Sequence, residues 1–140
     1  MKTRFSSLVK LKKSTMDKSE RVVQKANADL NSAAMALEIS YKSINEITPP
    51  QSGSMSDLLA TRALLSSGRG LIKHNQEWVG FAKDQVNQAK EKLKLDMIEH
   101  EKFKHLELQE IQKEIKKIKL QEMKDLDEVA LMTYAGKEKN

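Results

Sequence analysis

The sequence predicts an all-α fold, an antiparallel two-helix coiled-coil hairpin with a longer second helix, and three observations lead to it. Three Phe, two Tyr, one Trp and no Cys among 140 residues leave few large side chains for a globular core. Charged residues make up 32% and hydrophobic residues 39%, a composition typical of long helices. Both prolines lie side by side, so one firm break is expected, in the stretch EITPPQSGSMSD at residues 46–57.

The first helix is expected over residues 3–48. No Gly or Pro occurs from Phe5 to Ile47. Small or apolar residues recur every three or four positions, as on one face of a helix; they are Val22, Ala26, Leu30, Ala33, Leu37, Tyr41 and Ile44. Pro49 and Pro50 should end the helix, because proline lacks a backbone donor and disfavours the helical conformation in the residue before it. The turn is therefore placed at residues 49–56.

The second helix is expected over residues 57–135, followed by a charged tail at residues 136–140. Ser54 and Asp57 have the spacing of a capping box, in which each side chain accepts a hydrogen bond from the other residue's backbone amide. The expected seam positions alternate steps of three and four, as in heptads; they are Ile72, Asn75, Val79, Ala82, Val86, Ala89 and Leu93. The whole chain, residues 1–140, is interpreted as a single coiled-coil domain.

A turn centred between Ser52 and Gly53 predicts that facing residues have numbers summing to 105, such as Ala26 with Val79. A turn near residue 69, at the glycines of SSGRG, is the alternative. With the first register nothing faces the second helix from His105 onward, yet apolar residues continue at Leu108, Ile111, Ile115 and Ile118. Burying each such side chain is worth about 1.5 to 3 kcal/mol, so this stripe predicts a partner.

Residue types and spacings do not predict catalytic, cofactor-binding or metal-binding residues. His100 and His105 are five positions apart, on different sides of a helix, and helical zinc sites use a spacing of four. The acids are spaced as on solvated helix faces. We therefore expect a protein that is not an enzyme and has no cofactor.

The net charge of +5 is concentrated at the start, where the first thirteen residues hold five basic side chains and no acid. Such a segment attracts an acidic protein groove, anionic lipid or nucleic acid. Lysines interrupt this segment before an apolar stretch long enough for a signal peptide, and no run of 18 apolar residues occurs. Together with the lack of cysteine, this favours the cytoplasm.

Both ends of the chain resemble those of the FliJ family of the bacterial flagellar export apparatus. The opening FSSLVKLKK, at residues 5–13, and the closing DLDEVALMTY, at residues 125–134, carry the resemblance. The overall plan is also similar, with one break near a third of the length and a longer second helix.

The resemblance implies a stalk that couples the hexameric export ATPase to the cytoplasmic domain of the membrane export gate. It also implies an escort role for export chaperones and a location peripheral to the inner membrane at the flagellar base. The ring-binding residues it implies are Phe5, Leu8, Lys10, Lys12, Lys13, Ile111, Ile115, Leu126, Asp127, Glu128 and Tyr134. The gate-binding residues it implies are Leu37, Tyr41, Ile44, Leu65, Leu71 and Asn75.

Two alternatives belong to other classes of protein. A general helical-hairpin holdase of the prefoldin kind would need strand pairs between its helices, and residues 48–55 leave no room for them. A coiled coil that binds a membrane surface or nucleic acid would use the basic start, but arginine and aromatic residues are too sparse for base readout, so no nucleic acid is expected. The oligomeric state, the cargo chaperones and the choice between a flagellar and an injectisome system stay open.

Overall fold

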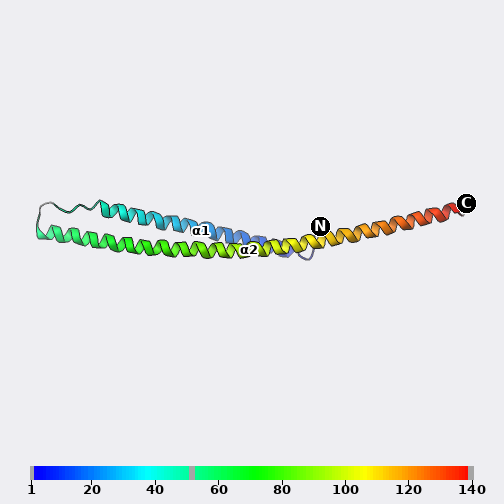
Figure 1. Cartoon of the computed structure of the whole chain (residues 1–140), viewed down its shortest axis with the longest axis horizontal. Coiled ribbons are helices and arrows are strands. Elements are labelled where there is room, and N and C mark those ends of the chain that lie inside the picture. Colours follow the sequence, from blue (N-terminus) through cyan, green and yellow to red (C-terminus); the bar gives the residue numbers. More distant parts are fainter. Residues whose placement is uncertain (1, 51–52, 139–140) are drawn as a thin grey trace. The chain divides into compact units, whose positions relative to one another are not determined.

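The computed structural model describes residues 2–50 and 53–138, and the regular elements within these ranges are two helices. Helix α1 spans Ser6–Asn45 and helix α2 spans Met55–Glu138 (Figure 1). They pack against each other as a hairpin, which confirms the predicted fold class. The chain divides into two packing units: unit 1 comprises Met1–Thr15 and Met97–Asn140, and unit 2 comprises Met16–Asp96.

Thr3 caps the start of α1. Its hydroxyl accepts a hydrogen bond from the Phe5 amide at 3.1 Å, while its own amide donates to Ser6 Oγ at 2.9 Å. These two bonds resemble a capping box, with the Phe5 amide as donor in place of the Ser6 amide, which bonds to the Thr3 carbonyl. Regular α-helix begins at Ser6, slightly later than the predicted start at residue 3.

Helix α1 ends at Asn45, earlier than the predicted residue 48. Pro49 has no amide to donate to the Asn45 carbonyl, and its ring clashes with that carbonyl in a helix. The Ile47 amide instead donates to the Ile44 carbonyl in a final tight turn. Helix α2 begins at Met55, directly after Ser54, whose carbonyl accepts from the amides of Asp57 and Leu58. It continues to Glu138, past the predicted end at residue 135, and runs through SSGRG without a break. Lys139 and Asn140 lie outside the described residues.

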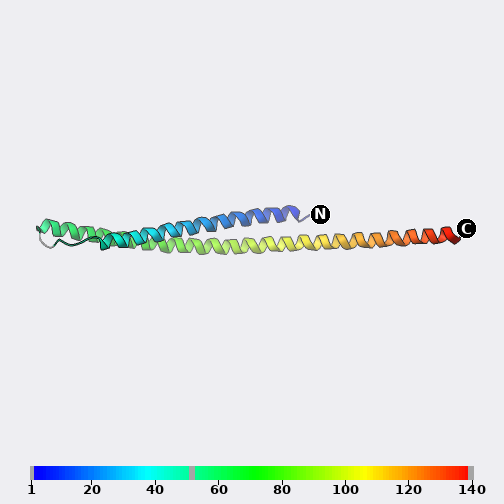
Figure 2. The ribbon, with the colours of Figure 1, turned by 90° about the horizontal axis from the view of Figure 1, so that it is seen from above.

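Small residues at every seventh position form the buried seam of unit 2, where α1 and α2 lie side by side (Figure 2). In α1 they are Ser19, Ala26, Ala33 and Ser40, and in α2 they include Asn75, Ala82 and Ala89. Larger apolar side chains flank this column: Val23, Leu30 and Val86 pack around Ala26 and Ala89. Val22, which the sequence placed on the seam, is 54% exposed, and Val23 takes its place.

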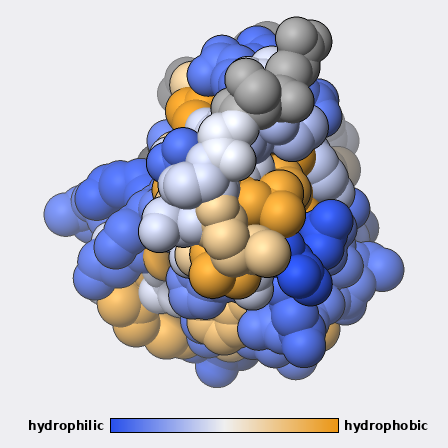
Figure 3. All heavy atoms as spheres, turned by 90° about the vertical axis from the view of Figure 1, so that its left-hand side faces the viewer, coloured by the Kyte–Doolittle hydropathy of each residue, from blue (hydrophilic) through white to orange (hydrophobic). Residues whose placement is uncertain are grey.

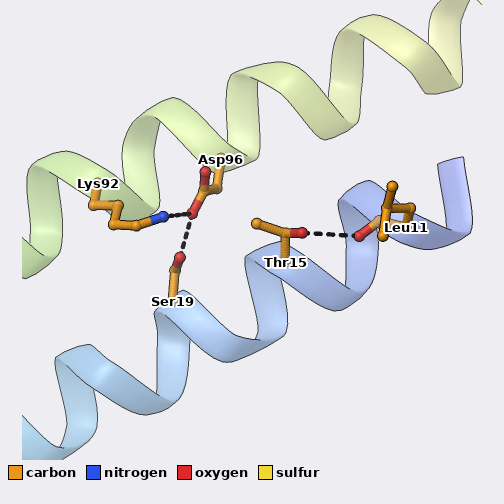
Figure 4. Close-up of polar contacts among 5 residues, drawn as sticks. All are labelled: Leu11, Thr15, Ser19, Lys92 and Asp96. Atoms are coloured by element: carbon orange, nitrogen blue, oxygen red, sulfur yellow. Dashed lines mark hydrogen bonds and ion pairs between the residues drawn. The ribbon is translucent and has the colours of Figure 1, made fainter. Parts of the chain in front are cut away.

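Polar pairs lie near each end of this seam. Ser19 donates to Asp96, which also accepts from Lys92 Nζ at 3.1 Å, as the side chains in Figure 4 show. Toward the connection, Asn75 donates to Ser40 and to the Ala36 carbonyl at 3.2 Å. Among the described residues, no buried side-chain nitrogen or oxygen lacks a hydrogen-bond partner. The seam is therefore apolar in its middle and polar at both ends.

The register differs from the predicted one. Ser19 with Asp96 and Ser40 with Asn75 have residue numbers that sum to 115, and the packing of Ala26 with Ala89 follows the same rule. The prediction of 105, with Ala26 against Val79, is wrong. It assumed that both helices reach the turn, whereas residues 46–50 are not helical. Extended chain advances about 3.3 Å per residue, against about 1.5 Å in a helix. Each residue of the connection therefore spans about two residues of α2, and α1 pairs with positions of α2 farther along the chain than predicted.

The helices of unit 1 keep this register with different chemistry. Lys12 Nζ lies 5.5 Å from the centre of the Phe103 ring, and these two numbers again sum to 115. Arg4 forms an ion pair with Glu110 at 2.8 Å. Charged and aromatic side chains thus replace the small seam residues of unit 2, and Arg4, just before α1, extends the contacts along α2 to Glu110.

Candidate functional site

Lys12 is the one lysine of the predicted basic cluster that unit 1 holds inside the hairpin. It packs over Phe103 and lies 3.7 Å from Glu99, a residue that sequence reasoning did not single out. The Lys10 and Lys13 side chains are exposed, Phe5 is half-buried under Arg4, and Leu8 is 37% exposed. The basic start therefore splits into Lys12, engaged within the chain, and Lys10 and Lys13, open to a partner.

An open hollow lies beside this basic segment. Residues of both helices line it, among them Val9, Lys13, His100, His105 and Ile111. It is shallow and faces solvent, without the enclosure that tunes catalytic groups. Among the described residues, no cluster of three or more His, Cys, Asp or Glu side chains could hold a metal. Lys13 and Ile111, both among the predicted ring-binding residues, line this same hollow.

The unpartnered end of α2 starts later than predicted. The sequence placed its start at His105, but Arg4 contacts Glu110, and Lys2 and Thr3 line a hollow with Glu114 and Ile118. This start is therefore wrong, and the cause is the register described above. Every residue from 112 to 136 is exposed, and this segment is called the overhang below. Of the predicted ring-binding residues it holds Ile115, Leu126, Asp127, Glu128 and Tyr134, whereas Ile111 is half-buried at its edge.

The apolar stripe of the overhang is not a continuation of the hairpin seam. Continued by heptads, the seam position of Phe103 leads to Glu110, Lys117 and Lys124, which are charged. Ile111 and Ile118 instead lie one residue after this series, and Ile115 and Val129 lie one residue after the other seam series, that of Val86. One residue is about 100° round the helix. Ile115 and Ile118 are 40% and 42% exposed, while Leu126 and Val129 are 68% and 59% exposed. The overhang therefore carries a second apolar face, directed away from the line along which α1 packs.

The predicted gate-binding residues all lie in unit 2 but differ in accessibility. Tyr41 is 43% exposed and accepts a hydrogen bond from Gln76 at 2.8 Å, and Leu71 is 51% exposed. Leu37, Ile44 and Leu65 are half-buried. Asn75 is only 6% exposed, and its amide is bonded to Ser40 and Ala36. In this conformation Asn75 fixes the hairpin and is not open to a partner.

A stripe of exposed residues on α2 begins at the predicted Leu71 and continues through three residues that were not among the predicted site residues. Leu71, His74, Trp78 and Phe81 follow steps of three and four on one side of the buried seam, and the last three line an open hollow with Glu77. Phe81 is 63% exposed and Trp78 is 39% exposed. The signal was available, since Trp78 is the single tryptophan and falls between the seam positions Asn75 and Val79.

The end of unit 2 that carries the connection adds further apolar surface. Seen from that side, hydrophobic patches stand between hydrophilic residues (Figure 3). Met55, Leu58, Leu59 and Leu64 are all large and exposed there. Unit 2 thus combines a tightly bonded seam with apolar side chains left in solvent.

The structure is a hairpin with a basic start, a seam that polar pairs close at both ends, and an exposed end that is acidic and apolar. The chain matches one family model, that of the flagellar FliJ protein, over residues 1–139. The chain belongs to the FliJ family. No curated protein and no solved structure matches the chain. Membership in this family makes the chain a component of the flagellar export apparatus. No helix among the described residues of this FliJ chain is long and apolar enough to cross a membrane.

Proposed function

We propose that the protein is a non-catalytic coupling element that links the export ATPase ring to the cytoplasmic domain of the export gate. Unit 1 docks on the ATPase, and the exposed stripe of unit 2 docks on the gate. The protein acts in the cytoplasm, at the membrane base of the flagellum. The family resemblance extends the proposal to escorting export chaperones.

The observation that carries the proposal is the overhang. Its large apolar side chains are exposed over residues 112–136, and a helix with that much apolar surface in water is expected to have a partner. Leu126, Val129 and Tyr134 supply apolar contacts, and Asp127 and Glu128 supply charge. Lys10 and Lys13 add positive charge from α1 in the same unit. Unit 1 therefore offers charge of both signs and apolar surface to the ATPase.

The exposed side chains of unit 2 support the proposal that this unit binds the gate. Tyr41 and Leu71 keep the role that the sequence predicted for them, and Trp78 and Phe81 extend that surface along α2. Large aromatic side chains are the residues that most often dominate protein interfaces. Asn75 is assigned to the hairpin seam instead, because its polar groups are satisfied within the chain.

The test uses two variants that control for each other. Leu126→Ser with Val129→Ser changes the overhang, and Trp78→Ala with Phe81→Ala changes the gate-facing stripe. We expect the overhang variant to lose binding to the purified export ATPase and to keep its affinity for the gate domain. We expect the stripe variant to lose affinity for the gate domain and to keep binding to the ATPase. Exposed substitutions change the free energy of unfolding by within about 0.5 kcal/mol, so thermal unfolding should be nearly unaltered for the overhang variant.

Binding is measured by pull-down and titration against each partner separately. If the overhang variant binds the ATPase as the parent does, the docking assignment of unit 1 fails. If the stripe variant keeps full affinity for the gate domain, the assignment of unit 2 fails.

A further inference from the structure

We propose that the overhang also pairs with the overhang of a second copy of the chain, antiparallel, forming a homodimer. The proposal concerns the chain on its own and goes beyond the coupling function above. It rests on how charge is distributed along an exposed apolar face.

The charges of the overhang are segregated along the helix. Residues 113–124 hold five Lys and two Glu, a net charge of +3, whereas residues 125–134 hold Asp125, Asp127 and Glu128 and no basic residue, a net charge of −3. All of these residues are exposed. A parallel pair would place the basic half against the basic half of its copy. An antiparallel pair places the basic half of each copy against the acidic half of the other, so charge selects the antiparallel arrangement.

The apolar face supports the same pairing. With Glu122 at the two-fold axis, facing residues have numbers that sum to 244, so Ile115 meets Val129 of the second copy and Ile118 meets Leu126. The two Glu122 side chains then face each other at the axis, and the opposite-charge pairs on the flanks have to outweigh this repulsion. These four side chains are each at least 40% exposed. The stripe is turned about 100° from the seam along which α1 packs, and only Ile118 among the four also borders the hollow lined by Lys2, Thr3 and Arg4 of its own chain.

The flanks of the stripe are complementary as well. At about 100° per residue, Lys116, Lys119 and Asp127 fall on one flank, and Lys117, Asp125 and Glu128 fall on the other. In an antiparallel two-fold pair each flank faces its own counterpart, so lysine meets acid on both sides. Glu114 shares a hollow with Lys2 and Arg4 of its own chain, whose positive charges offset its own.

The test is a charge-swap experiment on the full chain by sedimentation velocity. An acidic variant carries Lys116→Glu and Lys117→Glu, and a basic variant carries Asp127→Lys and Glu128→Lys. The parent should dimerise with rising concentration and less so with added salt, because exposed charge pairs are screened over about 8 Å at physiological ionic strength. Each variant alone should dimerise about tenfold more weakly or worse, and an equimolar mixture should form a heterodimer.

Direction is tested with single cysteines, since the chain has none of its own. Glu122→Cys, at the two-fold axis, should form disulfide-linked dimers under mild oxidant. Ile115→Cys, on the same stripe, should not, because antiparallel pairing places Val129 of the second copy opposite it, whereas a parallel pair would crosslink at both positions. A parent that stays monomeric at all concentrations, variants that dimerise as the parent does, or equal crosslinking at both positions would each overturn the proposal. Circular dichroism of each variant confirms that the helices are intact. No partner protein is present, so the outcome is independent of ATPase or gate binding.

Discussion

Gly68 lets α2 pass close to the end of α1. A Cβ atom added there would lie 3.2 Å from both Cγ1 and Cδ1 of Ile44, tighter than ordinary van der Waals contact. At Gly70 and Gly80 an added Cβ would meet nothing within 4 Å. All three glycines lie in the same helix, so each should destabilise it through backbone entropy to a similar extent. Only Gly68 is also needed for close packing, so comparing the three positions distinguishes the two effects.

Replacing each glycine with alanine should therefore give different results. Gly80→Ala should raise the free energy of unfolding by about 1 kcal/mol, because alanine loses less backbone entropy in a helix. Gly68→Ala should gain clearly less, because Ile44 must move to admit the methyl group. Chemical denaturation of both variants measures the difference. An equal gain at both positions would mean that Ile44 does not pack on Gly68 in solution.

At the scale of the helices, the polar pairs fix the register. A slide of α1 by one heptad would place Ser19 or Ser40 against alanine and would leave Asn75 without Ser40. Leaving a buried polar group without a hydrogen bond costs about 1 to 3 kcal/mol, and a seam asparagine is known to specify register in coiled coils. The alanine pairs between them would tolerate the slide, so the serines, Asn75 and Asp96 distinguish the registers.

Engineered cysteines test this register directly. Ala26→Cys with Ala89→Cys should form an intramolecular disulfide under mild oxidant, because the two positions pack in one cluster. Ala26→Cys with Val79→Cys is the matched control and should stay reduced. Electrophoresis without reductant, with mass spectrometry of the linked peptides, reports the outcome. Crosslinking of the control pair alone would restore the register that sums to 105.

Much of the hairpin could be predicted from the sequence, because heptad spacing and paired prolines act locally. The seam positions Ala26, Ala82 and Ala89 followed from spacing alone, and the second helix begins at Met55, two residues before the predicted Asp57. The register could not be predicted, since it depends on how far the nonhelical connection runs past α2. Trp78 was missed because its spacing also fits a seam edge, and only burial distinguishes the two. The offset of Ile111 and Ile115 from the seam became visible only once Phe103 was placed against Lys12.

At the scale of the whole molecule, the proposed binding surfaces consist of side chains that do not pack in the seam. Unit 2 carries the small-residue seam and its polar pairs, and its exposed aromatic stripe lies to one side of that seam. Unit 1 carries the overhang, whose residues contribute little to the hairpin because they are exposed. Substitutions in the overhang are therefore expected to change association more than stability.

The central claim, that residues 112–136 are an unpartnered docking segment, is tested most directly by hydrogen exchange of the isolated chain and of its complex with the export ATPase. At a concentration where the chain is monomeric, amides of the overhang should exchange orders of magnitude faster than amides of residues 75–96 in the seam. Adding the ATPase should protect the overhang selectively. Overhang amides that are as protected as the seam without any partner, or unchanged when the ATPase is bound, would contradict the account.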